Sequence, residues 1–253
     1  MTGVRGVLLD IEGTTSSVAF VYEVLFPYAR RELADFLRRR WGEPDTARAC
    51  ERIARDAGAP SLSAWVGPDA TPESARGRVA AEALRLMDGD VKATGLKELQ
   101  GLIWQEGYDA GRLKSHVYPD VPPALRRWAE RGLDLRIYSS GSIGAQKVFF
   151  AHTDAGDLLG LFRGHYDTTT GPKREAESYR RIAADMKMPP STILFLSDVR
   201  QELDAAAEAG MRTALVARPG NAPVAVGHGH PVVADFGQVD RLILGTAPAA
   251  YSP

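Results

Sequence analysis

Near its N-terminus the sequence reads Arg5-Gly6-Val7-Leu8-Leu9-Asp10-Ile11-Glu12-Gly13-Thr14-Thr15, an apolar run that passes directly into two carboxylates. The run Gly6–Leu9 is typical of a fully buried strand in a parallel sheet, and ligands of open α/β sheets bind beyond the carboxyl ends of such strands. Because successive side chains of an extended segment point to opposite sides, Asp10 and Glu12 can face one site while Ile11 packs away from it. This layout favours a carboxylate nucleophile, although acidic residues also commonly end strands and turns.

The residues that follow these carboxylates suit a tight, anion-binding turn. Gly13 permits a backbone conformation that other residues rarely adopt, and Thr14 and Thr15 supply hydroxyl and amide donors. We therefore expect a ligand site at the end of the first strand.

Composition sets the class of protein. The chain has 253 residues, of which 44% are hydrophobic, enough for a full-sized core in one large domain or two smaller ones. A net charge of −1 provides no field that would attract nucleic acid or an anionic membrane. The single cysteine, Cys50, excludes an intrachain disulfide, and neither a secretion signal nor a membrane span is recognisable. We expect a soluble, cytoplasmic monomer whose partner is a small molecule rather than nucleic acid or membrane.

The pattern of elements changes along the chain. Residues 17–111 are helical in character, with helices expected over 20–41 (interrupted by Pro27), 71–87 and 94–108. After residue 111 strands and helices alternate, which is typical of a parallel sheet with crossover helices. Expected strands cover 133–138, 192–196 and 212–216, and expected helices cover 120–128 (capped by Asp120), 143–152, 179–186 and 201–210. We predict an α/β fold: a doubly wound parallel sheet from residues 1–16 and 112–253, with a helical cap, 17–111, inserted where it would roof Asp10.

Three further groups of polar residues fall at strand ends or turns of this sheet. The second strand leads into Ser139-Ser140-Gly141-Ser142, whose hydroxyls and amides are suited to a phosphate. A late strand ends in Ser197-Asp198, where a hard cation could be held opposite Asp10. Lys173 follows a Gly-Pro turn, and it gains meaning only beside the others.

Other polar residues have simpler interpretations. Glu202 and Asp204 follow Asp198 on the next helix, and we interpret both as members of a solvated helix face. His228 and His230 lie in a Gly-rich loop without further metal ligands, so we interpret them as surface residues.

Taken in order, these motifs are similar to those of the haloacid dehalogenase superfamily. They resemble most closely the enolase-phosphatase (acireductone synthase) family of methionine salvage, and the resemblance spans almost the whole chain. Glu12 is its most discriminating residue, because most superfamily phosphatases carry Asp there; Pro172, where the family pattern has His, is its main departure. Further matching segments are Gly107-Tyr108, Gly111-Arg112-Leu113-Lys114, Gly164-His165-Tyr166-Asp167-Thr168 and Arg218-Pro219-Gly220-Asn221.

The resemblance implies a Rossmann-type core, an inserted helical cap and a phosphoric monoester hydrolase. Its substrate would be 2,3-diketo-5-methylthiopentyl-1-phosphate, converted through an enol phosphate to 1,2-dihydroxy-3-keto-5-methylthiopentene and phosphate, with one Mg²⁺ per chain. The residues that it implies are catalytic Asp10 and Glu12, metal-binding Asp10, Glu12 (through its carbonyl) and Asp198, and substrate-binding Ser139, Ser140 and Lys173.

The expected chemistry follows from the charge of a phosphate monoester. Its negative oxygens repel an attacking carboxylate, so a cation and fixed donors must neutralise them. Asp10 would then form an aspartyl-phosphate that water hydrolyses, with Glu12 as proton donor and later acceptor. Glu12 and an unidentified residue of the cap both remain candidates for the base that enolises the substrate.

Two alternative functions remain at this point. One is a phosphatase of the same superfamily that acts on another small phosphate monoester. The other is a phosphorylatable signalling receiver, which also combines carboxylates, a hydroxyl and a lysine on a doubly wound sheet. The position of the nucleophile after the first strand and the length of the chain argue against a receiver.

Overall fold

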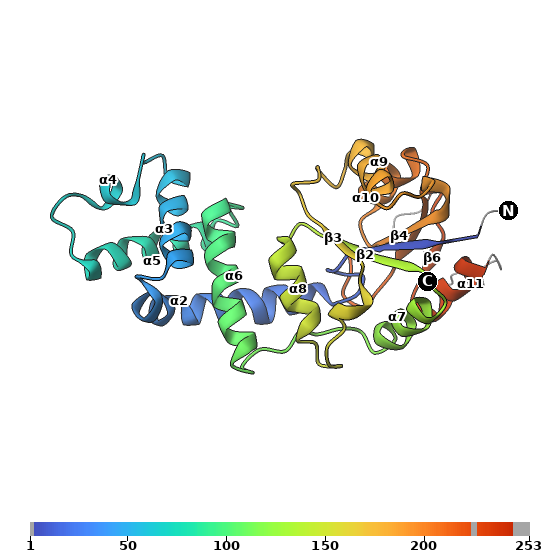
Figure 1. Ribbon diagram of the computed structural model, residues 1–253, viewed down its shortest axis with the longest axis horizontal. Coiled ribbons are helices and arrows are strands. Elements are labelled where there is room, and N and C mark those ends of the chain that lie inside the picture. Colours follow the sequence, from blue (N-terminus) through green and yellow to red (C-terminus); the bar gives the residue numbers. More distant parts are fainter. Residues whose placement is uncertain (1–2, 224–226, 245–253) are drawn as a thin grey trace. The chain divides into compact units, whose positions relative to one another are not determined.

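The structure is a computed structural model that describes residues 3–223 and 227–244 (Figure 1). The chain forms two compact units, one made of the described residues within Met1–Val21 and Lys114–Pro253 and the other of Tyr22–Leu113. From the sequence we expected the corresponding divisions after residues 16 and 111.

The first unit contains a sheet of six parallel strands in the order β3-β2-β1-β4-β5-β6. This confirms the predicted α/β class and the doubly wound parallel sheet, whose strand order reverses direction beside β1. Strand β3 was not predicted, because its three residues are too few for a recognisable pattern. The strands are β1 (Gly6–Leu9), β2 (Asp134–Tyr138), β3 (Gly164–Tyr166), β4 (Ile193–Ser197), β5 (Arg212–Val216) and β6 (Val232–Val233).

Helices cover both faces of the sheet. In Figure 1, α9 and α10 lie on one side, and α7 and α11 lie on the other. The sheet is buried between them, and Val7, Leu8 and Leu9 of β1 have no exposed surface. The helical segments of this unit are α1 (Val18–Phe20), α7 (Val121–Glu130), α8 (Ile143–Ala151), η2 (Leu159–Leu161), α9 (Ala176–Asp185), η3 (Pro190–Thr192), α10 (Arg200–Glu208) and α11 (Phe236–Leu244).

One predicted helix cap is wrong. Asp120 precedes α7, but its side chain makes no capping hydrogen bond to that helix. Its carboxylate instead accepts two hydrogen bonds from the guanidinium of Arg218, each 2.9 Å long. A bidentate, charge-assisted pair is stronger than a single cap, so the long-range partner prevails over the local one.

The second unit is entirely helical in the part of the chain that the structure describes. Pro27, which we expected to interrupt this helical stretch, lies in the first turn of α2. Thr71 caps α5 by accepting a hydrogen bond from the Ser74 amide. The segments are the π-helical turn η1 (Val21–Leu25), which begins at the boundary, then α2 (Phe26–Arg40), α3 (Pro44–Asp56), α4 (Leu62–Val66), α5 (Pro72–Asp88) and α6 (Thr94–Asp109).

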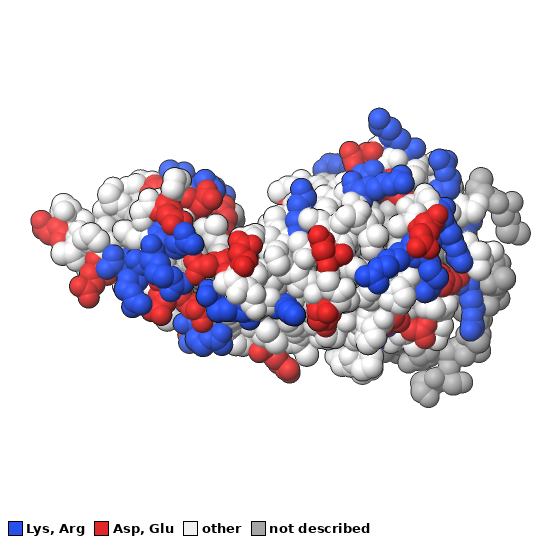
Figure 2. All heavy atoms as spheres, turned by 60° about the horizontal axis from the view of Figure 1, so that its bottom comes forward, with Lys and Arg blue, Asp and Glu red and all other residues white. Residues whose placement is uncertain are grey.

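The surface charges are mixed in sign. Figure 2 shows Lys and Arg side chains interspersed with Asp and Glu over the visible face of each unit. Within residues 3–223 and 227–244, no helix is long and apolar enough to cross a membrane.

Candidate active site

The predicted site residues follow adjacent strands in the middle of the sheet. Asp10 directly follows β1, Ser139 directly follows β2, and Asp198 directly follows β4. Because β1 pairs with both β2 and β4 in parallel register, with Leu9 opposite Ile137 and Leu196, the three chain segments leave the sheet at one edge. This is the edge at which ligands of doubly wound sheets bind.

Backbone hydrogen bonds hold the turn that follows Asp10. The amides of Thr14, Thr15 and Ser16 all donate to the carbonyl of Ile11, at 3.2, 3.0 and 2.9 Å. Gly13 permits this tight turn with a φ of +69°. Asp10 is 5% exposed, and Glu12 lies half-buried on the same turn. The turn therefore holds both predicted catalytic side chains on an immobilised backbone.

Lys173 forms an ion pair with the predicted nucleophile. Its Nζ lies 2.8 Å from Oδ1 of Asp10 and 2.6 Å from Oε2 of Glu202. All three side chains are largely buried, with exposed fractions of 9%, 7% and 11%. Burial disfavours the charge on Lys173, but the two carboxylates outweigh that cost and raise its pKa. Lys173 is therefore a fixed cation at the carboxylate of Asp10.

Three side-chain hydroxyls hold the loop that carries Lys173. The hydroxyls of Tyr138, Ser178 and Tyr179 donate to the carbonyls of Gly171, Pro172 and Lys173, at 2.8, 2.8 and 2.7 Å. Since three successive carbonyls are bound in this way, the loop presents Lys173 in one position. Pro172, the departure from the family pattern, takes part in this scaffold through its carbonyl.

Glu202 is not part of a solvated helix face, so that interpretation is wrong. It is 8% exposed, and its carboxylate accepts a hydrogen bond of 3.0 Å from the hydroxyl of Ser197 besides pairing with Lys173. The helical pattern of α10 could not reveal this pairing, because Lys173 lies in the loop between β3 and α9, about thirty residues earlier in the chain. Burial and the negative charge of Asp10 raise the pKa of Glu202.

Asp198 lies close enough to Asp10 for the two carboxylates to repel each other. Burial, followed by the charge of Asp10, raises the pKa of Asp198 to about 7. A Cβ added to Gly13 would lie only 2.2 Å from Oδ2 of Asp198, so the lack of a side chain at Gly13 makes room for this carboxylate. Lys173 neutralises only part of the negative charge gathered here.

This donor set fits a hard divalent cation. A buried carboxylate, a half-buried carboxylate and a backbone carbonyl are oxygen ligands of the kind that Mg²⁺ binds together with water. Within the described residues, no group of three or more His, Cys, Asp or Glu side chains is arranged to hold a metal ion. The predicted set contains only two such side chains, Asp10 and Asp198, with the carbonyl of Glu12 as the third ligand.

The predicted phosphate-binding serines differ in their surroundings. Ser139 is 3% exposed, and its hydroxyl accepts a hydrogen bond of 3.3 Å from the amide of Gly141, whereas Ser140 is exposed. Nε2 of Gln146 donates to the carbonyls of Gly141 and Tyr166, both at 2.8 Å. This buried amide, to which we assigned no role from the sequence, fixes the path of the serine loop.

The loop after β5 contributes two residues to which the sequence analysis assigned no role. Nε of Arg218 donates to the carbonyl of Thr14 at 3.2 Å, and Nδ2 of Asn221 donates to the carbonyl of Gly13 at 2.8 Å. Both belong to the segment 218–221, which matched the family pattern. That match, together with their position after a strand next to the centre of the sheet, was the signal that could have indicated a role.

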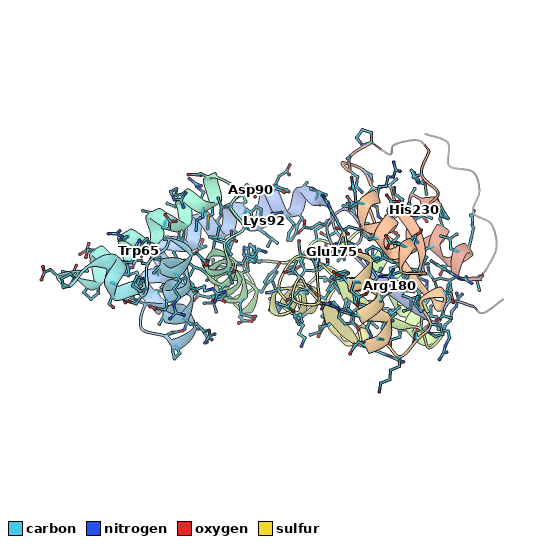
Figure 3. All side chains as sticks on the ribbon, turned by 90° about the horizontal axis from the view of Figure 1, so that it is seen from above. Trp65, Asp90, Lys92, Glu175, Arg180 and His230 are labelled. Carbon is cyan, nitrogen blue, oxygen red and sulfur yellow. The ribbon has the colours of Figure 1, made fainter. Side chains whose placement is uncertain are left out.

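We expected His230, on the segment before β6, to be a surface residue, and that interpretation is wrong (Figure 3). It is 9% exposed, and its ring bonds to Thr213 at 2.7 Å and to Asp204 at 2.9 Å. These contacts fasten the segment before β6 to β5 and α10.

The comparisons with known proteins agree with this geometry. The family model described as haloacid dehalogenase-like hydrolase matches residues 4–210. Enolase-phosphatase E1 of Pseudomonas aeruginosa is 51% identical over 236 residues, which are 93% of this chain and 98% of that protein. The chain belongs to the enolase-phosphatase E1 family of haloacid dehalogenase-like hydrolases.

A second relative and a solved structure are similar to this chain over nearly the same range. Enolase-phosphatase E1 of Sorangium cellulosum is 49% identical over 218 residues, or 86% of this chain and 90% of that protein. The crystal structure of the UTR4 protein (Unknown transcript 4 protein) from Saccharomyces cerevisiae superposes with a TM-score of 0.74 at 34% identity, covering 92% of this chain and 98% of that one. Family membership makes the chain a hydrolase with a phosphatase core, which confirms the predicted enzyme class and decides against a signalling receiver.

Proposed function

We propose that this enzyme converts 2,3-diketo-5-methylthiopentyl-1-phosphate, through an enol phosphate, to the acireductone 1,2-dihydroxy-3-keto-5-methylthiopentene and phosphate, a reaction of methionine salvage. The observation that carries the proposal is the buried carboxylate of Asp10, paired at 2.8 Å with Lys173 at the carboxyl end of β1. Glu12, two residues beyond it, and the high identity to enolase-phosphatases support the choice of substrate.

In the first half of the dephosphorylation, an oxygen of Asp10 attacks phosphorus and the bond from phosphorus to the substrate oxygen breaks. Glu12 gives its proton to the departing oxygen. Lys173, together with Ser139 and Ser140, binds the phosphoryl oxygens, which lowers the repulsion that the attacking carboxylate meets. The product of this half is an aspartyl-phosphate and the released acireductone.

In the second half, water attacks the aspartyl-phosphate and gives a proton to Glu12. Phosphate leaves, and Asp10 and Glu12 return to their starting protonation states. Because Lys173 lies beside Asp10 in the resting site, the nucleophile is regenerated as a carboxylate beside a fixed cation.

We propose one Mg²⁺ per chain, held by Asp10, Asp198 and the backbone carbonyl of Glu12. When bound, it would neutralise negative charge on the phosphoryl oxygens. The mutually repelling carboxylates of Asp10 and Asp198 support this assignment, because a cation would relieve the repulsion between them.

Enolisation requires a base and stabilisation of the developing enolate. Lys173 is placed to stabilise negative charge on an oxygen bound near Asp10. The enolate is delocalised into the neighbouring ketone, so it is a better leaving group than a simple alkoxide. We propose that the enzyme acts as a monomer in the cytoplasm on this small substrate, without nucleic acid or membrane as a partner.

The proposed function is tested by measuring Mg²⁺-dependent phosphate release from a panel of small phosphate esters that includes the diketone phosphate. We expect the diketone phosphate to be the best substrate and chelation to abolish turnover. Preference for another ester would assign the enzyme to the alternative, a phosphatase of the same superfamily with a different substrate.

The Asp10→Asn variant separates the two half-reactions, since only dephosphorylation needs the nucleophile. With saturating Mg²⁺, ultraviolet absorbance and phosphorus NMR should show an enol phosphate that accumulates without free phosphate. Unchanged diketone, with Mg²⁺ binding confirmed, would mean that Asp10 also takes part in enolisation.

A further inference from the structure

Asn221 binds the turn that follows the nucleophile with both hydrogens of its side-chain amide. Nδ2 donates to the carbonyl of Gly13 at 2.8 Å and to the carbonyl of Val216 at 3.2 Å. These contacts join the end of β5 to the turn after β1. They also determine which way the amide points, because a flipped amide would place its oxygen against two carbonyl oxygens.

With its orientation determined, the amide leaves its oxygen without a donor. Oδ1 of Asn221 is buried and has no hydrogen-bond partner among the described residues. A buried acceptor without a partner is costly, and in native proteins it usually indicates a bound water or ion that completes the site.

The unpartnered oxygen lies next to the proposed metal site. A Cβ placed on Gly13 would be 3.1 Å from Oδ1 of Asn221 and 2.2 Å from Oδ2 of Asp198, so the two oxygens flank one point. An ionised carboxylate and an amide oxygen are both acceptors, and neither can satisfy the other. A water molecule bound to a cation is a suitable shared partner, because it is polarised and donates strongly to nearby acceptors.

We propose that Asn221 is a positioning residue of the metal site: Nδ2 holds the backbone of Gly13, and Oδ1 accepts a hydrogen bond from a water bound to the divalent cation. This inference rests on the proposed function, since it takes Asp10 and Asp198 as the side chains that hold the cation. Asn221 would then orient a water ligand and thereby strengthen binding of the cation without touching it.

The sequence offers a direct probe of this role, because Asn221 is the only asparagine in the chain. Protein labelled with ¹⁵N in asparagine alone therefore gives one pair of side-chain amide signals, which needs no assignment. We expect Mg²⁺, added without substrate, to shift this pair saturably, and a chelator to reverse the shift. Signals that do not respond as Mg²⁺ saturates the protein would overturn the proposal.

Calorimetric titration with Mg²⁺ alone provides the second measurement. Asn221→Ala should weaken Mg²⁺ binding about ten- to a hundredfold, the usual effect of removing a residue that supports the ligands of a metal. Gln238→Ala is the matched control, because it also removes a half-buried amide from the same unit, at the start of α11, and should leave the affinity unchanged. Thermal unfolding of each variant checks that it is folded.

Asp198→Asn distinguishes failure of this inference from failure of the proposed function. If the wild-type protein binds no Mg²⁺, or if Asp198→Asn binds it unchanged, the metal assignment in the proposed function is wrong. If Asp198→Asn loses Mg²⁺ binding while Asn221→Ala retains the wild-type affinity, only the role of Asn221 is refuted.

Discussion

Replacing Gly13 by alanine tests how closely the turn after the nucleophile is fitted to Asp198. An added Cβ would lie 2.2 Å from Oδ2 and 2.5 Å from Cγ of Asp198, and the backbone φ of +69° is unfavourable for alanine. Because Cβ atoms do not approach other atoms this closely, the carboxylate or the turn must move by about 1 Å. A displacement of that size in an active site lowers the rate about 100-fold, which corresponds to a loss of about 2.7 kcal/mol of transition-state stabilisation.

Gly132→Ala is the control that separates the effect of the contact with Asp198 from the effect of a positive φ at alanine. Gly132 has a φ of +78°, and an added Cβ there would meet nothing within 4 Å. Both variants should lose about 1–2 kcal/mol of unfolding free energy through the left-handed conformation. Only Gly13→Ala should lose activity and Mg²⁺ affinity in addition.

The measurements are urea unfolding for stability, and Mg²⁺-dependent phosphate release for kcat/KM and for the Mg²⁺ requirement. If Gly13→Ala retains wild-type kcat/KM, or if Gly132→Ala loses as much, then the close approach between Gly13 and Asp198 has no role in the site.

Two further predictions concern charge. Lys173→Ala should lower kcat/KM for the phosphate ester about 100- to 1,000-fold, because it removes a fixed cation from the attacked group. Lys147→Ala, at an exposed position, should change kcat/KM little. Similar losses for the two variants in steady-state assays would count against the placement of Lys173. Burial, assisted by the charge of Lys147, lowers the pKa of His165 from its ordinary 6.5 to about 4, so the unfolded chain binds a proton that the folded protein does not. His165 should therefore destabilise the fold as the pH falls from about 6.5 to 4. In thermal unfolding over this range His165→Gln should lose less stability than wild type, and parallel curves for the two proteins would refute the shift.

The sequence was sufficient to identify the fold class and the residues at the strand ends. The buried apolar runs Gly6–Leu9, followed by Asp10, and Ile193–Leu196, followed by Ser197 and Asp198, indicated a parallel sheet with both carboxylates at one edge. This inference succeeds because strand burial and the alternation of strands and helices are local properties of the sequence. The order of the motifs then indicated the family, which the comparisons confirm.

Only the tertiary structure decided which polar residues complete the site. Glu202 looked like an exposed helical residue, yet it shares Lys173 with Asp10. Asp120 looked like a helix cap, yet it binds Arg218 from 98 residues away. The spacing of these residues in the sequence says nothing about which loop ends meet at the sheet edge. Burial then selects the partners, because a charge removed from water must find an opposite charge or a hydrogen bond wherever the fold supplies one.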